Sequence, residues 1–371
     1  MKVVVVGAGV AGAAVAVALR RIGAEVTVHE AYEDPAGPVG SFVSLAVNGL
    51  RGLDALGCLD EVRAAGFPVA RQRMWAGDTG RLLGDVPRGR AADDPLHSVT
   101  LMRADLVGVL RTAAGRAGAR IVTGHRPAPA DPDLADADLV IGADGIRSAT
   151  RRGLDPSAPE PAYAGLYSVS GVSDGVHGDP GTFNMTFAKC GVFIHLPAPD
   201  GTTWWSAQVA APRAPDLAAV GIAELSGLYR TEQRPLDVLR AAQRIDAATL
   251  HHVLAPVPRR HDDRTVLIGD AAHPVGAGQG ASMAIEDAVV LARELHRAAT
   301  VPAALAAYDG LRDRRIGRMA KAASANRDAK TAGPVTARLR NLVMPFVFPR
   351  FYPRATGWLY DYEPGGLPAG R

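Results

Sequence analysis

The chain has 371 residues, 47% of them hydrophobic and 21% charged, which is enough apolar material for a sizeable core and excludes long disordered stretches. Its formal net charge of +3 is too small to indicate a nucleic-acid partner without a clustered basic face. Its two cysteines, Cys58 and Cys190, lie far apart, so we expect neither a disulfide framework nor a metal site, and the length favours more than one domain.

The first residues, MKVVVVGAGVAGAAVAVALRR, could be mistaken for an export signal or a short membrane span. A four-valine run followed by regularly spaced glycines is more typical of a strand, a turn and a helix. We therefore predict a buried strand over 3–6, a helix over 10–21 and a second strand over 25–30, which form a βαβ unit. The protein is then expected to be cytoplasmic.

The next segments continue the alternation of helices and strands. Leucines at 50, 53, 56 and 59 predict a helix over 48–66. A further helix is predicted over 103–118, with strands over 120–124 and 138–145.

From about residue 160 the pattern changes to short strands, predicted at 182–188, 191–196 and 203–210. Phe183, Met185 and Phe187 alternate onto one side of the first of these strands. The section therefore predicts a mainly antiparallel sheet with one apolar face. Helices are expected after it, at 215–230 and 235–244.

The buried-strand pattern returns at 265–269, before predicted helices at 279–297 and 302–326. The fold class is therefore α/β, a Rossmann-like domain with a mainly antiparallel β-sheet domain inserted into it. We assign residues 1–70, 97–160 and 260–330 to the first domain, 71–96 and 161–259 to the inserted one, and 331–371 to a C-terminal tail rich in aromatic residues and proline.

A glycine-rich turn joins the first strand to the first helix. Gly7 allows a tight turn, Gly9 lets the backbone approach a pyrophosphate, and Gly12 lets the helix pack on the strand. The phosphate would meet free N–H groups at the helix start, and Glu30 would accept hydrogen bonds from ribose hydroxyls. This motif does not separate NAD from FAD. Its predicted contacts are Gly7, Gly9, Val10, Ala11, Gly12 and Glu30.

Two further motifs follow buried strands, at the strand ends where open α/β sheets bind ligands. One is Asp144-Gly145, which alone would be an ordinary turn. The other is Gly269-Asp270, followed by glycines at 276, 278 and 280 and then by a helix. A helix N-terminus carries a partial positive charge, which suits an electron-accepting ring that becomes anionic at one edge.

The order of the three motifs resembles that of the class A flavoprotein monooxygenases, the para-hydroxybenzoate hydroxylase-like group, over about residues 1–325. The resemblance implies a GR2-type FAD-binding domain. The segments that carry it are VVVVGAGVAG with Glu30, GSFVSLAVNGLRGLDALG at 40–57, MRADL at 102–106, DLVIGADGIRSATR at 138–151 and GDAAHPVGAGQGASMAIEDA at 269–288.

The resemblance also implies roles for single residues. Arg103 would lie near the FAD pyrophosphate or ribityl chain, and Asp270 would bind the ribityl hydroxyls. Asp144 and Gly145 would act in handling FAD and NAD(P)H. The flavin's pyrimidine edge would meet N–H groups near the start of the last motif's helix. The implied contacts from this last motif are Gly269, Asp270, Gly278, Gly280, Ala281 and Ser282.

The implied reaction is a monooxygenation in bacterial secondary metabolism. NADH or NADPH reduces FAD, O₂ adds to form a C4a-hydroperoxide, and one oxygen atom hydroxylates or epoxidises an apolar, aromatic or polycyclic metabolite. The flavin carries the chemistry, so we assign no catalytic side chain. We expect a monomer or homodimer that does not bind membranes. The expected substrate pocket consists of Phe183, Met185, Phe187, Trp205 and Pro274.

Two other classes remain open. One is a flavin oxidase or reductase without oxygen transfer, and the other is a non-redox FAD-binding protein. A halogenase is disfavoured because the chain has no WxWxIP segment. For His273 we expect a loop hydrogen bond. For Glu286 and Asp287 we expect structural roles, in which they face either the helix environment or a neighbouring arginine.

Two features depart from the family pattern or from regular structure. The loop at 275–277 is shorter than in many family members, at the place where the flavin's reactive face is expected. The tail carries prolines at 345, 349 and 353, which oppose a long regular helix. It could be a flap packed on the FAD domain, a lid or dimer contact, or a patch at a membrane interface.

Overall fold

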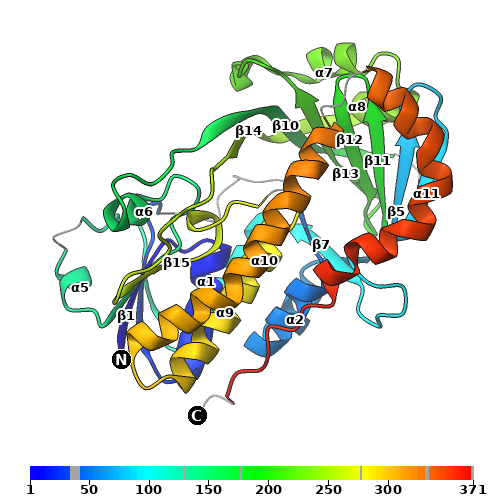
Figure 1. Ribbon diagram of the computed structural model, residues 1–371. Helices are drawn as coiled ribbons and strands as arrows, with labels where there is room; N and C mark the ends of the chain where they lie inside the picture. The colour runs from blue at the N-terminus through cyan, green and yellow to red at the C-terminus, as the bar shows by residue number, and fades with distance from the viewer. Residues whose placement is uncertain (34–41, 129–130, 176–177, 276–277, 331–333, 369–371) are drawn as a thin grey trace.

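The computed structural model describes residues 1–371 apart from 34–41, 129–130, 176–177, 276–277, 331–333 and 369–371, and it does not describe the side chains of 325–340, 347–350 and 353. Figure 1 shows two adjoining parts, one that carries the N-terminus and one built on a larger sheet. Two long helices run along both parts (Figure 1).

The first part is organised on a five-stranded parallel sheet in the order β15-β9-β1-β2-β8. The runs VVVV and LVIG are almost entirely buried, because both faces of a parallel sheet are covered. The strands are β1 (Lys2–Val6), β2 (Glu25–His29), β8 (Arg120–Val122), β9 (Leu139–Gly142) and β15 (Thr265–Leu267).

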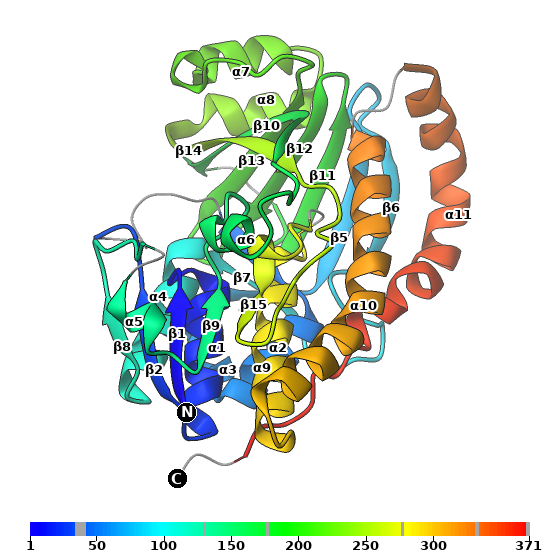
Figure 2. The same cartoon turned by 60° about the vertical axis from the view of Figure 1, so that its left-hand side comes forward.

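Four helices pack together beside this sheet. In α1, every side chain from Ala13 to Leu19 is buried, and their small size allows α4 and α9 to approach closely. Figure 2 shows α1 and α9 beside the strands, with α10 on the outside of α9. The helices are α1 (Val10–Arg21), α4 (Arg103–Arg116), α9 (Gly280–Arg297) and α10 (Val301–Lys330).

The second part is a seven-stranded sheet in the order β14-β10-β13-β12-β11-β5-β6, antiparallel except for the parallel pair β11 and β5. Two helices, α7 (Ile222–Leu228) and α8 (Gln233–Arg240), cover one of its faces after the short 3-10 turn η1 (Leu217–Ala219). The strands are β5 (Arg71–Ala76), β6 (Leu82–Pro87), β10 (Ala162–Asp174), β11 (Thr182–Ala188), β12 (Gly191–Pro197), β13 (Thr202–Ala210) and β14 (Ala242–Val253).

A small antiparallel sheet, β3-β7-β4, lies where the two parts meet. Its neighbour α2 packs on α9, which connects this sheet to the first part. The elements here are β3 (Phe42–Leu45), α2 (Val47–Leu56), α3 (Leu59–Ala64), β4 (Phe67–Val69) and β7 (Ser98–Met102). The remaining short elements are α5 (Pro132–Ala135), α6 (Ala149–Leu154) and η2 (Gly269–Ala271).

The structure corrects two predicted helices. The expected helix over 48–66 is two helices, because Gly57 adopts a left-handed φ of 71° and its N–H caps Asp54 O, which ends α2. The expected helix over 235–244 ends at Arg240, and β14 follows. The sequence of β14, AQRIDAATLHHV, is rich in alanine and polar residues, so only its pairing with β10 makes it a strand.

The tryptophan pair of β13 divides between the two faces of the large sheet. Trp205 was expected in a pocket above the flavin, and we correct that expectation. Trp205 is fully buried beneath α7 and α8, stacked on Phe193 with ring centroids 6.0 Å apart. Trp204 instead shares the opposite face with Phe183 and Phe187.

The tail forms a long helix, α11 (Pro334–Tyr360), which corrects the expectation that its prolines prevent one. Each proline removes one N–H, and a spacing of four residues places these gaps on one side of the helix. In a regular helix, the N–H at position 345 would donate to Asn341 O, but Pro345 has no N–H. Asn341 O accepts a hydrogen bond from Arg81 Nη2 instead. No described helix is both long and apolar enough to cross a membrane.

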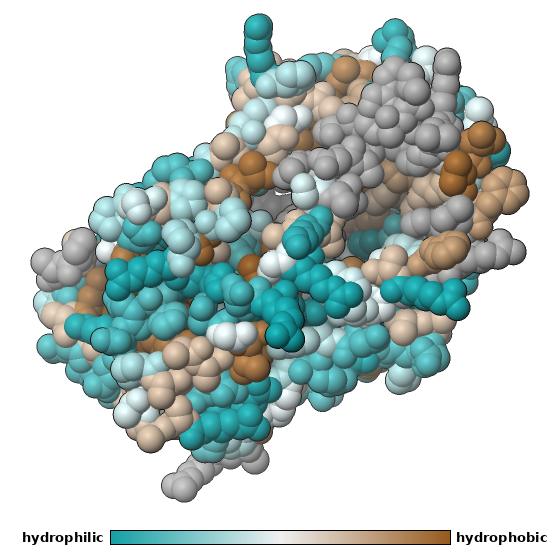
Figure 3. All heavy atoms as spheres, in the orientation of Figure 1, coloured by the Kyte–Doolittle hydropathy of each residue, from teal (hydrophilic) through white to brown (hydrophobic). Residues whose placement is uncertain are grey.

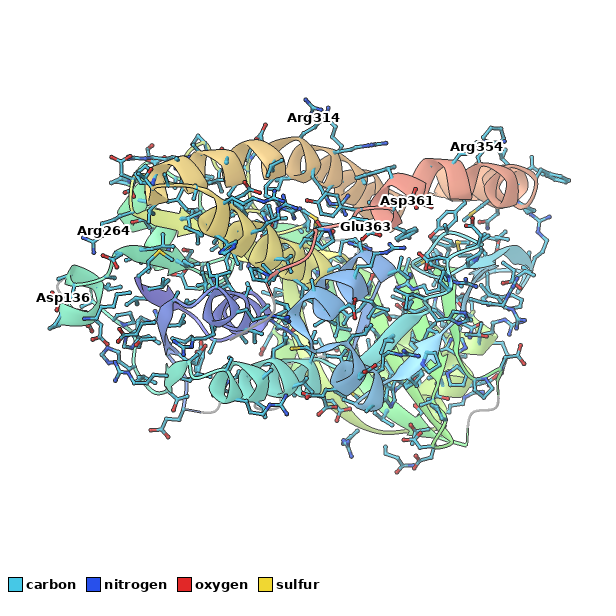
Figure 4. The ribbon with its side chains drawn as sticks, turned by 90° about the horizontal axis from the view of Figure 1, so that it is seen from below. Asp136, Arg264, Arg314, Arg354, Asp361 and Glu363 are labelled. Carbon is cyan, nitrogen blue, oxygen red and sulfur yellow. The ribbon has the colours of Figure 1, made fainter. Side chains whose placement is uncertain are left out.

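The tail packs on both parts of the molecule. Met344 and Tyr352 contact the apolar cluster of the large sheet, while Tyr360 belongs to the main core of the first part. Figure 4 shows Asp361 and Glu363 near the place where the end of α11 approaches α10, and Arg315 of α10 donates to Trp358 O and Leu359 O there.

We predict that Trp205→Ala lowers the free energy of unfolding by about 3–5 kcal/mol, because it empties a fully buried site. Urea unfolding followed by circular dichroism measures this. Trp204→Ala is the matched control, since Trp204 is only partly buried and should cost less. Equal losses would contradict the assignment of the two faces.

Candidate active site

The first glycine turn has the geometry of a dinucleotide-binding loop. Gly7 has a φ of 102°, and a Cβ there would lie 2.5 Å from Ala143 O. A Cβ on Gly12 would lie 1.8 Å from Gly7 O, so the helix can approach the turn only without a side chain. A Cβ on Gly9 would meet nothing within 4 Å. The packing of the protein therefore does not require a glycine at position 9, and the open space beside Gly9 fits a ligand.

The start of α1 offers unpaired donors to that space. Ala13 N–H is the first to bond back into the turn, to Gly9 O at 2.9 Å, and no side chain caps the helix. The N–H groups before it are left to a partner outside the helix. Glu30 is buried at the end of β2, where Oε2 accepts from Ala8 N at 2.7 Å. Its remaining lone pairs can still accept ribose hydroxyls.

The Asp144-Gly145 pair lies at the end of β9, beside Gly7. One carboxylate oxygen of Asp144, Oδ2, accepts from Thr150 N and Oγ1, both at 3.0 Å. The other, Oδ1, is buried without a partner among the described residues. Since buried polar atoms are normally hydrogen-bonded, Oδ1 fits a group supplied by a ligand.

The third motif follows β15 and turns sharply at Gly269, whose φ is 57°. A Cβ on Gly269 would lie 2.8 Å from Ala11 Cβ, so this glycine lets the motif close against α1. Asp270 is accessible to solvent, but protein atoms surround its carboxyl group closely. These surroundings raise the pKa of the carboxyl, while the charges of His273 and Arg103 lower it. Asp270 therefore lines a recess.

Arg103 begins α4 on the same recess. Its side chain is exposed, its charge acts on Asp270, and it forms no ion pair with a described residue. It is free to meet a phosphate or a ribityl oxygen.

The start of α9 faces Asp270, since a Cβ on Gly280 would lie 3.7 Å from Asp270 Oδ1. No side chain caps this helix, and Met283 N is the first to bond back, to Gln279 O at 2.9 Å. The N–H groups of Gly280, Ala281 and Ser282 are therefore donors without helical partners. The Ser282 side chain turns away from them, because a Cβ on Gly49 of α2 would lie 2.5 Å from Ser282 Oγ.

A buried ion-pair network lies behind this helix start. Glu286 and Asp287 of α9 and Arg312 of α10 are fully buried, and Arg315 of α10 is 8% exposed. Arg312 contacts Glu286 Oε2 and Asp287 Oδ1, each at 2.7 Å, and Arg315 contacts Glu286 Oε1 at 2.6 Å. The expected arginine contact is thus present, and two arginines supply it.

Asp287 also holds the third motif. Its Oδ2 accepts from Gly269 N at 2.9 Å and contacts His273 Nε2 at 2.6 Å, so His273 makes the expected loop contact. Burial alone would raise the pKa of Asp287, but His273, Arg312 and these hydrogen bonds lower it to about 2. Asp287 is therefore ionised and positions the loop that carries Asp270.

Two positioning residues were not predicted from the sequence. Asn48 of α2 donates to Glu286 Oε1 at 2.7 Å, which ties α2 to α9. Arg151, fully buried, donates to Ala271 O at 3.0 Å and Ile146 O at 2.7 Å, which ties the second motif to the third. Nothing in the sequence separates Arg151 from its exposed neighbours Arg147 and Arg152.

The expected pocket residues lie partly together. Phe183, Met185 and Phe187 share the apolar face of the large sheet with Trp204. Trp204 contacts Phe42 of β3, with ring centroids 6.1 Å apart, and β3 in turn contacts α9. This face is thereby joined through β3 to α9. Pro274 is half-buried beside His273, and of the shortened loop, 276–277 lie outside the described residues.

The fold and these three motifs define an FAD-binding α/β oxidoreductase. The glycine turn leaves open space and free N–H donors that fit a pyrophosphate, Asp270 and Arg103 line a recess, and the free donors of α9 face Asp270. The orphaned Asp144 Oδ1 and the open space at Gly9 are what the protein leaves for a cofactor.

Comparison with known proteins identifies the family. Residues 130–323 match the FAD-binding domain family, and residues 5–55 match an NAD(P)-binding Rossmann-like domain. Aurachin C monooxygenase/isomerase of Stigmatella aurantiaca is 33% identical over 334 residues, which cover 84% of this chain and 85% of that protein. The chain belongs to this family of FAD-dependent monooxygenases, the class A flavoprotein hydroxylases, and FAD is its cofactor.

Two more relatives agree with this assignment. A 3-amino-4-hydroxybenzoate 2-monooxygenase of Streptomyces cremeus is 32% identical over 316 residues, 78% of this chain and 77% of that protein. The structure of Klebsiella pneumoniae HpxO with FAD and uric acid superposes with a TM-score of 0.73 at 24% identity, covering 99% of this chain and 93% of that one. This last likeness supports the fold.

We predict that Gly9→Ala folds with a nearly unchanged free energy of unfolding, because the added methyl group meets no protein atom. It should bind FAD about tenfold more weakly, a loss of ~1.4 kcal/mol in binding free energy, because the methyl group occupies open space that a pyrophosphate needs. Gly12→Ala should instead lower the free energy of unfolding by more than about 3 kcal/mol, because its methyl group overlaps Gly7 O. FAD titration by fluorescence and urea unfolding separate the two effects. Full FAD affinity in Gly9→Ala would contradict the assigned role.

We predict that Asp287→Asn lowers the free energy of unfolding at pH 7 by about 3–5 kcal/mol, because Arg312 loses a buried partner. The folded-state pKa of Asp287 lies below the ordinary 3.8, so its contribution is complete above that pH and is lost as pH falls through about 2. The difference between wild type and variant should therefore shrink between pH 4 and pH 2.

Urea unfolding at stepped pH is the measurement, with Asp54→Asn as control, since Asp54 is exposed on α2 and makes no ion pair with a described residue. A difference that stays constant down to pH 2 would refute the ionised state of Asp287.

Proposed function

We propose that this flavoprotein uses NADH or NADPH and O₂ to hydroxylate or epoxidise an aromatic or polycyclic metabolite. The observation that carries the proposal is the aromatic face of the large sheet, joined through β3 to α9, the helix whose free N-terminus faces Asp270. A flat apolar ring on that face would be presented to the flavin end of the cofactor site. The relatives named above act, by their names, on aurachin C and on 3-amino-4-hydroxybenzoate.

In this proposal the protein binds, orients and excludes water. Asp270 accepts hydrogen bonds from the ribityl hydroxyls, and the first N–H groups of α9 donate to the pyrimidine edge of the ring. Bound FAD supplies the redox chemistry with O₂. Phe183, Met185 and Trp204 supply an apolar surface that keeps water from the reacting centre.

The oligomeric state, the cellular location and the domain boundaries stay predictions. A monomer or homodimer is expected, in the cytoplasm, where both nicotinamide nucleotides are available. The domain boundaries also remain predictions, although the two larger sheets divide the chain at closely similar places. The competing functions are a flavin oxidase or reductase and a non-redox FAD-binding protein.

We predict that the purified protein is yellow, that adding an accepted substrate stimulates NAD(P)H oxidation, and that the product carries one atom of label from ¹⁸O₂. Substrate candidates are aromatic acids, phenols and aurachin C, and products are followed by mass spectrometry. The matched control is label from H₂¹⁸O, which should not enter the product. Oxidation of NAD(P)H with unlabelled products from every candidate would favour the oxidase or reductase, and a protein that cannot be loaded with FAD would exclude the whole proposal.

A further inference from the structure

An arginine interrupts the apolar face of the large sheet. Arg88 follows β6 directly, and its guanidinium carbon lies 3.8 Å from the centroid of the Phe183 ring. Its Nη1 donates to Gln72 Oε1 at 2.5 Å. Gln72 is itself buried on β5, beside Phe183 in the register and on the same face as Met74. The polar side chains of Arg88 and Gln72 thus lie together on a sheet face that otherwise carries apolar side chains.

The charge of Arg88 has no counter-charge among the described residues. Arg312 and Arg315 pair with carboxylates, and Arg151 donates to two carbonyl oxygens. The guanidinium of Arg88 has one described hydrogen-bond partner, the neutral Gln72, although it carries five N–H donors. A partly buried cation without a partner is costly, so the presence of Arg88 here points to a partner that binds from outside.

The surroundings fit a binding subsite. Burial lowers the pKa of Arg88, and the nearby phenols of Tyr352 and Tyr360 oppose this. Both tyrosines belong to α11, and their hydroxyl groups lie 3.3 Å apart. Arg88 is therefore held between the sheet and α11, with an aromatic ring on one side and phenol hydroxyls nearby.

The backbone next to Arg88 connects it to the cofactor side. Gly89 O accepts from Val47 N at 3.0 Å, at the start of α2. Asn48, the next residue, donates to Glu286 of α9. The arginine is thus anchored to the helix whose free end faces the flavin position.

We propose that Arg88 binds a carboxylate group of the substrate, while the substrate's ring lies on the apolar face beside Phe183. A planar guanidinium suits this task, because it can give two parallel hydrogen bonds to a carboxylate while its face stays stacked on an aromatic ring. This inference rests on the proposed function and narrows its substrate class from apolar aromatic compounds to aromatic carboxylates.

The substrate is a better partner for Arg88 than the cofactor phosphates. The three cofactor motifs follow strands of the five-stranded sheet, whereas Arg88 stacks on a strand of the seven-stranded sheet. Arg103 and the start of α1 are the donors on the cofactor side.

The test uses the FAD-loaded protein and three matched pairs of probes, benzoate with benzamide, salicylate with salicylamide, and anthranilate with anthranilamide. Binding is measured from the change in flavin absorbance. We expect at least one carboxylate to bind about tenfold or more tightly than its amide, the size of a charge-assisted hydrogen bond. Arg88→Gln should abolish this preference while leaving amide affinity unchanged, and Arg88→Lys should restore part of it.

The control is Arg71→Gln, which removes a charge from an exposed position on the neighbouring strand and should leave the preference intact. If no carboxylate binds more tightly than its amide, or if Arg88→Gln keeps the preference, the inference is overturned. Loss of FAD in both Arg88 variants would assign Arg88 to the cofactor and also overturn it.

If Arg88→Gln does not fold, the test uses two other measurements. The preference of the wild-type protein for carboxylates over amides still tests the anionic subsite, and Arg88→Lys tests the role of Arg88 itself. Isotope incorporation tests the monooxygenase reaction separately. A protein that prefers carboxylates but transfers no oxygen would refute the proposed function and leave the anionic subsite standing.

Discussion

Two neighbouring carboxylates buried on α9, and the two arginines that neutralise them, are the constraint on which the rest of the site depends. Glu286 meets α2 and α10, while Asp287 meets α10 and the loop that carries Asp270. A buried charge is tolerated only when its partners are in place, so these four segments must assemble together. The free end of α9 is consequently aimed by directional charge contacts, which tolerate less displacement than apolar packing.

The parts of the fold with local signals could be predicted from the sequence. The valine run of β1, the glycines of the first turn and the Gly269-Asp270 pair each carry their geometry within a few residues, and the comparisons confirm the family and its cofactor. The strand β14 could not be predicted, because its alanines and polar residues become a strand only beside β10, far away in the chain. The period of two along a strand separates Trp204 from Trp205 but does not say which one faces the pocket.

The site shows the same division between local and non-local signals. The roles expected of Gly9 and Asp270 could be predicted from the sequence, because each residue closely follows a predicted strand. Asn48, Arg151 and Arg88 are ordinary polar residues in the sequence, and they become significant only through what they meet in space. The cofactor motifs thus use backbone geometry that many sequences share, whereas the proposed substrate face is distinguished by a few polar side chains on an apolar sheet.

The C-terminal segment is held in an unusual way. Arginines donate to the main-chain carbonyl oxygens of four of its residues, Arg315 to Trp358 and Leu359, Arg51 to Tyr360, and Arg293 to Pro364. Anchors of this kind do not depend on which side chains the segment carries. The stretch of α11 that lies over the sheet, with Met344 and Tyr352, can therefore exchange side chains while the attachment of the segment's end is preserved, which makes this stretch the natural place for evolution to retune which molecules the scaffold accepts.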